Sequence, residues 1–170
     1  MTSEDAGREL FGMDVSEAEA RTYLGDAEFG VLGLTKEGEA YTVPLSFGYD
    51  TDLTTLYFLF AFEGESKKRE FLETTETASF TVVESELPDA WTSVILTGTL
   101  THLSDEESTA YAALADTATF PALYTFEDYV DMESVEQSFY QFEVETITAR
   151  RSPKQLNNTA SEAIEAESTR

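Results

Sequence analysis

The chain of 170 residues contains no cysteine and a single histidine, His102. These absences exclude disulfides, thiolate catalysis and cysteine-based zinc sites, and they disfavour a histidine-rich metal centre or a histidine-dependent triad. Basic residues are also scarce, with 10 Lys and Arg against 34 Asp and Glu and a formal net charge of −24. Nucleic acid or an anionic membrane surface would repel such a chain overall, so neither is expected as a partner.

Long apolar runs are missing as well. No stretch of about 18 apolar residues occurs, so no membrane-spanning helix is predicted. Residues 1–12 contain three acids and lack the apolar core of a signal peptide, and we therefore expect a cytoplasmic protein. The acid excess runs along the whole chain, which resembles the halophilic proteins of salt-in organisms, where concentrated salt screens charge repulsion. The alternative is an ordinary acidic protein with an acidic partner-binding face.

Hydrophobic residues nevertheless make up 41% of the chain and aromatic residues 12%, and they occur in patterned runs. This composition and length indicate one folded domain that is large enough to bury a core. We expect a flexible arm over residues 1–12, a domain over residues 13–150 and a polar C-terminal tail over residues 151–170.

The patterning predicts a mainly β fold with a few helices. A capping box of Ser16 and Glu19 opens a helix over 17–24, and a second box of Ser104 and Glu107 opens a helix to about residue 116. Gly98 predicts a bulge or bend in its strand. Six strands are expected, over 29–34, 40–49, 55–62, 77–84, 91–103 and 134–148, with a short helix over 65–74. Strands joined by short turns imply an antiparallel sheet that curls into a small barrel.

Three of the ten basic residues are consecutive: Lys67, Lys68 and Arg69. Ser66 before them is a plausible N-cap, so the three cations would occupy the first turn of the predicted short helix. The helix macrodipole is positive there, and it makes a cation unfavourable by about 0.3–1 kcal/mol. A bound anion would reverse that sign, because backbone N–H groups, a hydroxyl and the cations would converge on it.

Two interpretations of this basic cluster compete. The cations could form local ion pairs with neighbouring acids, for example Arg69 with Glu73 at i,i+4 spacing. They could instead form a phosphate site. The buried apolar strand over 55–62 and the turn at Gly64 favour the second interpretation, because they place an anion pocket beside an apolar wall. Such a site suits a flat aromatic ligand that carries a phosphate.

Four segments carry a family resemblance: YTVPLSFGYD (41–50), LYFLFAFEGESKKREFL (56–72), TASFTVVE (77–84) and WTSVILTGTLTHLSDEE (91–107). In order and spacing they resemble the flavin-binding split-barrel proteins related to pyridoxamine 5′-phosphate oxidase, in the branch of small nitroimidazole-resistance-like flavoproteins. The resemblance implies a six-stranded antiparallel split β-barrel. It also implies a homodimer with each cofactor held at the subunit interface.

The resemblance implies FMN as the cofactor and assigns its contacts residue by residue. The flavin phosphate would lie on Lys68, with Lys67 and Ser66 beside it. The other implied cofactor-binding residues are Val43, Pro44, Leu45 and Ser46 along the isoalloxazine, Ala61 and Phe62 near the ribityl chain, and Ser93 as a polar contact to the flavin. No catalytic residue and no metal ligand is assigned.

The function implied by the resemblance is that of an FMN-binding flavoprotein, an oxidoreductase or flavin reductase that acts on a small molecule. The deazaflavin F420 is the alternative cofactor, since related split barrels bind it. The alternative function is non-enzymatic, as a flavin, F420 or haem binding module. A true vitamin B6 oxidase is not expected, because Arg150 and Arg151 occur late in the chain without the oxidase's C-terminal histidine motif.

Overall fold

The computed structural model describes residues 12–50, 54–62, 64–86, 90–104 and 136–153. These residues form two helices and a set of antiparallel strands. In chain order the elements are β1 (Met13–Asp14), α2 (Glu17–Asp26), β2 (Phe29–Lys36), β3 (Glu39–Ser46), β4 (Gly48–Asp50), β5 (Thr55–Phe62), α3 (Lys67–Thr74), β6 (Ala78–Glu86), β7 (Ala90–His102) and β8 (Glu136–Arg151). Neither of these helices is long and apolar enough to cross a membrane.

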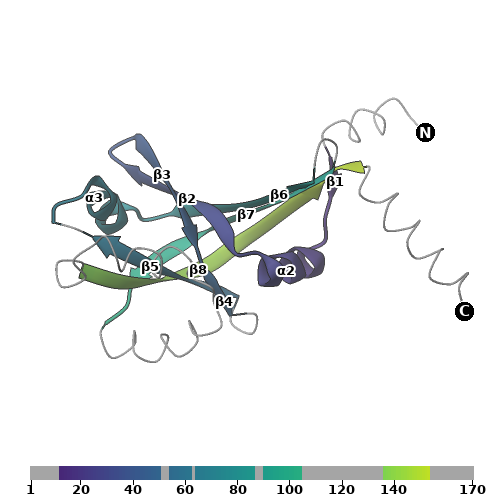
Figure 1. Cartoon of the computed structure of the whole chain (residues 1–170). Helices are drawn as coiled ribbons and strands as arrows, with labels where there is room; N and C mark the ends of the chain where they lie inside the picture. The colour runs from purple at the N-terminus through teal and green to yellow at the C-terminus, as the bar shows by residue number, and fades with distance from the viewer. Residues whose placement is uncertain (1–11, 51–53, 63, 87–89, 105–135, 154–170) are drawn as a thin grey trace, which may run out of the picture.

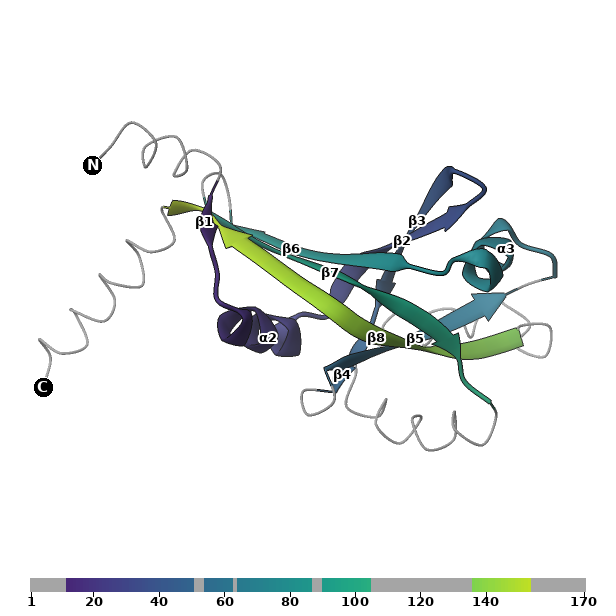
Figure 2. The same cartoon turned by 180° about the vertical axis from the view of Figure 1, so that it is seen from behind.

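The strands form one sheet in the order β3-β2-β6-β7-β8-β5-β4, and β1 pairs with the end of β8. Every pairing is antiparallel, which confirms the predicted fold class. Figures 1 and 2 show α3 at one end of the molecule, beside the β2–β3 hairpin and the end of β5. From there β6, β7 and β8 extend together towards β1 at the opposite end.

The sheet has eight strands rather than the predicted six. The strand expected over 40–49 is broken at Phe47, whose buried ring packs edge-on against Phe80 with 5.0 Å between ring centroids. Before this residue β3 pairs with β2, and after it β4 pairs with β5, so the chain changes its sheet neighbour there. The other additional strand is β1, which has only two residues and is too short to show an alternating sequence pattern.

Several local predictions are confirmed. The capping box at α2 is present in both directions between Ser16 and Glu19. Strand β5 has the predicted bounds, and most of its side chains are buried in the core. The bulge lies between Thr97 and Gly98. A Cβ on Gly98 would lie 2.0 Å from the carbonyl oxygen of Glu143, so this close approach requires glycine.

The chain ends are described only in part. Strand β8 continues to Arg151, beyond the predicted end of the strand at residue 148, and the Ser152 N–H then donates to the Trp91 carbonyl at 2.8 Å. The helix expected after Ser104 lies outside the described residues, as do most of the predicted arm over 1–12 and the tail from residue 154 onward.

Candidate functional site

The first turn of α3 carries the basic cluster. Ser66 is the N-cap with an extended backbone, and its Oγ accepts a hydrogen bond from the backbone N–H of Arg69 at 3.3 Å. Lys67, Lys68 and Arg69 are therefore the first three residues of the helix, as the sequence predicts. The three side chains then diverge, and each contacts a different part of the fold.

Lys68 points towards the end of β5. Its Nζ donates to the carbonyl oxygen of Ala61 at 2.8 Å and lies 5.0 Å from the ring centroid of Phe62 and 5.7 Å from that of Phe60. Burial lowers the pKa of this ammonium group. Within the part of the chain that the structure describes, no carboxylate forms an ion pair with Lys68. The residue is thus a half-buried cation held by one carbonyl and two aromatic rings.

Lys67 points the opposite way, towards the start of β3. Its Nζ forms an exposed ion pair with Glu39 and lies 5.6 Å from the ring centroid of Tyr41 and 5.4 Å from that of Phe71. This cation is already neutralised by a carboxylate in the folded chain.

Arg69 is neutralised too, by a partner far away in sequence. Its guanidinium donates to both carboxylate oxygens of Glu136, at 2.9 and 2.8 Å, and lies 4.3 Å from the Phe62 ring centroid. The pair raises the pKa of Arg69 and lowers that of Glu136. The alternative of an i,i+4 ion pair between Arg69 and Glu73 is therefore wrong about the partner, since Glu73 contributes only a longer-range attraction.

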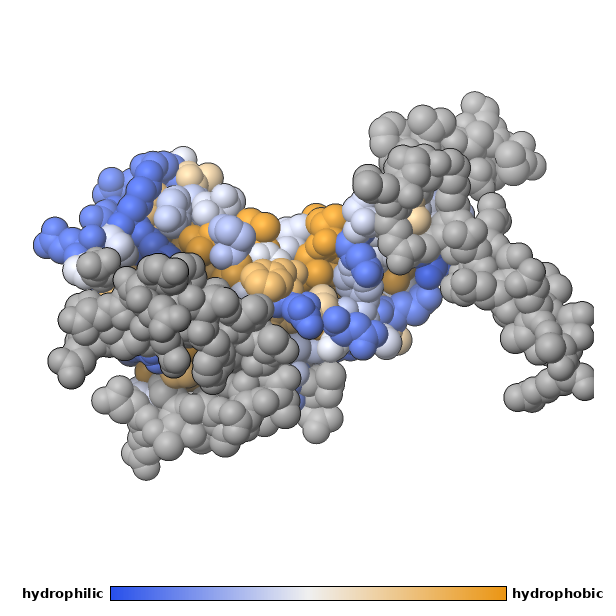
Figure 3. Space-filling model, viewed as in Figure 1, coloured by the Kyte–Doolittle hydropathy of each residue, from blue (hydrophilic) through white to orange (hydrophobic). Residues whose placement is uncertain are grey.

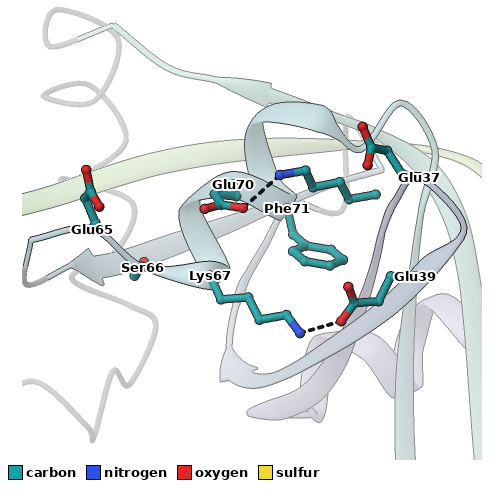
Figure 4. Close-up of a pocket in the computed structure, with 8 residues that line it drawn as sticks. Glu37, Glu39, Glu65, Ser66, Lys67, Glu70 and Phe71 are labelled. Atoms are coloured by element: carbon teal, nitrogen blue, oxygen red, sulfur yellow. Dashed lines mark hydrogen bonds and ion pairs between the residues drawn. The ribbon is translucent and has the colours of Figure 1, made fainter.

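A cavity of about 610 Å³ lies between the first turn of α3 and the β2–β3 hairpin. Figure 4 shows two ion pairs in it, with the Phe71 ring between them. One is the pair of Lys67 with Glu39, and the other joins Lys36 to Glu70 at 2.7 Å and lowers the Glu70 pKa. The lining residues are Lys36, Glu37, Glu39, Glu65, Ser66, Lys67, Glu70 and Phe71. The sequence alone did not predict this cavity, because its walls are far apart along the chain.

The predicted β3 residues lie further along the edge strand. Tyr41, near the start of β3, packs against Phe71 of α3 with 5.1 Å between ring centroids. The strand then leads away from α3 through the assigned positions. Val43 and Leu45 pack against the core, Pro44 is exposed and pairs with Val31, and Ser46 is buried.

Ser93 lies far from Lys68 within one chain. It pairs with Arg150 at one end of β8, whereas Phe62, beneath Lys68, pairs with Glu136 at the other end. Strand β8 has 16 residues. A strand of that length extends about 50 Å. The structure therefore brings together Ala61, Phe62, Ser66, Lys67 and Lys68, but it does not bring Ser93 to them.

One face of the sheet exposes apolar side chains near Ser93. Phe29, Val31, Val83 and Ile95 are 50%, 42%, 60% and 44% exposed, and they lie on the neighbouring strands β2, β6 and β7. We call these four residues the outer apolar face. In register, Val31 pairs with Thr81, which pairs with Ile95, and Val83 pairs with Ser93. Figure 3 shows hydrophobic surface gathered in the middle of the molecule.

The described residues include no group of three or more His, Asp or Glu side chains that could hold a metal ion. The one histidine, His102, is exposed at the end of β7 and packs edge-on against Tyr140, with 5.1 Å between ring centroids.

Comparison with known proteins gives a family match. The family described as pyridoxamine 5′-phosphate oxidase matches residues 16–151. None of the curated proteins matches the chain.

Solved structures share the fold at low identity. A FAD-binding protein from Mesorhizobium loti is 24% identical with a TM-score of 0.62, covering 82% of this chain and 96% of its own. A protein from Bacteroides thetaiotaomicron named for 5-nitroimidazole antibiotic resistance is 19% identical with a TM-score of 0.55, covering 82% and 86%. A haem binding protein from Mycobacterium smegmatis is 22% identical with a TM-score of 0.54, covering 76% and 51%. These likenesses establish the fold.

Proposed function

The chain belongs to the pyridoxamine 5′-phosphate oxidase family, and on that basis we propose that it is an FMN-binding flavoprotein that acts as an oxidoreductase on a small molecule. The observation that carries the proposal is Lys68. It is a half-buried cation in the first turn of a helix, and its hydrogen-bond partner is a backbone carbonyl rather than a carboxylate. A dianionic phosphate would supply the missing negative charge.

The residues around Lys68 fit a phosphate. The N-terminus of α3 offers backbone N–H groups and the positive end of the helix dipole. Ser66 adds a hydroxyl, and Lys67 begins the same helix turn, with its ammonium group paired to Glu39. Ala61 and Phe62 form an apolar surface beside Lys68, and the ribityl chain of a flavin would lie on it. These groups would bind the phosphate end and orient the rest of the cofactor along the sheet.

The separation of Ser93 from Lys68 supports a homodimer. If both residues hold one cofactor, the two must come from different subunits, because they lie at opposite ends of β8 in one chain. The outer apolar face lies beside Ser93 and offers an apolar surface for a second copy. We therefore propose that each site takes Lys68 from one subunit and Ser93 from the other.

A bound flavin would supply the redox chemistry. The chain itself would anchor the phosphate, cover the ring with apolar side chains and exclude water between two subunits. The substrate would be a small molecule that reaches the ring through the remaining opening.

Haem binding is the second candidate, since a solved haem binding protein shares the fold. Haem iron usually takes a histidine, thiolate, methionine or tyrosine ligand. The chain has one histidine, which lies exposed at the end of β7 against the ring of Tyr140. A phosphate better explains Lys68, which has no carboxylate partner among the described residues, and we therefore favour a flavin.

The test is a pair of titrations that follow quenching of flavin fluorescence, with FMN and with riboflavin, which lacks the phosphate. We expect the protein to bind FMN at least about tenfold more tightly than riboflavin, because charge-assisted hydrogen bonds hold the phosphate. Purified protein that is colourless and takes up neither flavin would refute the proposed function. Equal affinity for FMN and riboflavin would refute the phosphate site.

A further inference from the structure

We infer that Glu39 determines the preference of this site for a flavin mononucleotide over a flavin dinucleotide. The inference rests on the proposed function and concerns the same site. It starts from the cavity between α3 and the β2–β3 hairpin, and from the ion pair between Lys67 and Glu39 in its wall.

The first turn of α3 separates two environments. On one side Lys68 faces Ala61 and the rings of Phe60 and Phe62. On the other side Ser66 and Lys67 line the cavity. A phosphate held by Ser66 and Lys68, with its flavin end on the Ala61 side, would turn its remaining side towards the cavity. The second phosphate and the adenosine of a dinucleotide would have to continue into that space.

Space does not prevent this extension, because a cavity of about 610 Å³ is of the size that holds small-molecule ligands. Charge does. Among the described residues, the cavity is lined by four carboxylates, those of Glu37, Glu39, Glu65 and Glu70, and by two ammonium groups. Both ammonium groups are already paired, Lys36 with Glu70 and Lys67 with Glu39. A second phosphate would therefore meet net negative charge and no free cation in the cavity wall.

Glu39 has the largest influence among these carboxylates because it holds the one lysine that belongs to both the cavity and the helix start. Lys67 is the first residue of α3, and its pairing with Glu39 directs it along β3 and away from Lys68. Both side chains of the pair are more than half exposed, so the pair itself adds little to stability. Removing the Glu39 charge would therefore free Lys67 for a second phosphate without unfolding the protein.

The experiment measures the dissociation constants of FMN and FAD for the wild type, Glu39→Gln and Glu17→Gln. Glu17 pairs with Arg21 at 2.6 Å on the exposed side of α2, so its substitution makes the same change in charge away from the site. We expect the wild type to prefer FMN, and we expect Glu39→Gln to lower that preference by about threefold to tenfold, mainly by tightening FAD. Glu17→Gln should leave the preference unchanged.

The outcomes separate the two proposals. If FMN binds but Glu39→Gln leaves the FMN-to-FAD ratio unchanged, or shifts it no more than Glu17→Gln does, the inference about Glu39 is wrong and the proposed function stands. Wild-type protein that binds FAD as tightly as FMN would also overturn the inference alone. Protein that binds neither flavin would overturn the proposed function and the inference with it.

Discussion

The Nζ of Lys68 donates to the carbonyl oxygen of Ala61 at 2.8 Å, which ties the first turn of α3 to the end of β5. Its two neighbours in the sequence reach carboxylates instead, since Lys67 pairs with Glu39 and Arg69 with Glu136. Among the residues that the structure describes, two of the three cations thus have a carboxylate partner and Lys68 has none. This division singles out Lys68 as the residue that a bound anion would contact.

The pH dependence of FMN binding should report on Lys68. Burial lowers its pKa, and a bound phosphate would favour the charged form. FMN affinity should therefore be full below the lowered pKa and decrease as the pH rises through it. Lys68→Arg should keep its affinity over the same range, because an arginine stays protonated up to about pH 12. The measurement is the dissociation constant between about pH 7 and pH 10, and parallel curves for the two proteins would contradict the assignment.

A charge on the outer apolar face should disrupt the proposed dimer. We expect wild-type protein to show twice the 18.9 kDa mass of the chain by light scattering. Val83→Asp should shift it to the monomer mass and weaken FMN binding, because Val83 pairs with Ser93 on that face. Thr22→Asp on the exposed surface of α2 is the matched control. A monomeric wild type, or a dimer that tolerates Val83→Asp, would contradict this interface.

The bulge in β7 should be sensitive to a single methyl group. Gly98→Ala would place a Cβ 2.0 Å from the Glu143 carbonyl oxygen, so the backbone would have to move. We expect the free energy of unfolding to fall by about 1–3 kcal/mol in urea denaturation. Gly25→Ala, where nothing lies within 4 Å of the new Cβ, should be neutral or stabilising by up to about 1 kcal/mol. Equal effects of the two substitutions would show that the close approach is not a constraint.

Salt should stabilise the protein if its acidity is an adaptation to a saline environment. The net charge of −24 implies repulsion among the acidic side chains. The screening length that limits this repulsion is about 10 Å at 0.1 M salt and about 3 Å at 1 M salt. We therefore expect the Tm followed by circular dichroism to rise steeply with potassium chloride and the fold to be lost on dialysis to low salt. A Tm that does not change with salt would support the ordinary acidic protein instead.

Much of the fold was predictable from local patterns. The capping box at Ser16, the apolar run of β5 and the glycine at the bulge are each contained within a few residues, and all three are confirmed. The break at Phe47 was not predictable in this way. The pattern over 40–49 continues through it, and the break comes from the contact with Phe80 and the change of partner strand.

The sequence predicts the start of the helix in the candidate site, but it does not predict which residues surround that start. Ser66 and the three cations lie where the sequence places them. Glu39 and Glu136 are 28 and 67 positions from their partners, and in so acidic a chain no local signal distinguishes them from other glutamates. The resemblance assigns Ser93 to the same cofactor as Lys68, but only the strand register shows that one chain holds them apart.

The most direct test of the central claim is calorimetric titration of FMN into Lys68→Ala and into Lys36→Ala. Lys36 is a nearby lysine that pairs with Glu70 and lines the cavity, so its loss controls for the general removal of positive charge. Lys68→Ala should weaken FMN binding by about 1.5–3 kcal/mol, roughly tenfold to a hundredfold, whereas Lys36→Ala should change it by about twofold or less. Unchanged affinity in Lys68→Ala, or an equal loss in both variants, would contradict the assignment of Lys68 to the flavin phosphate.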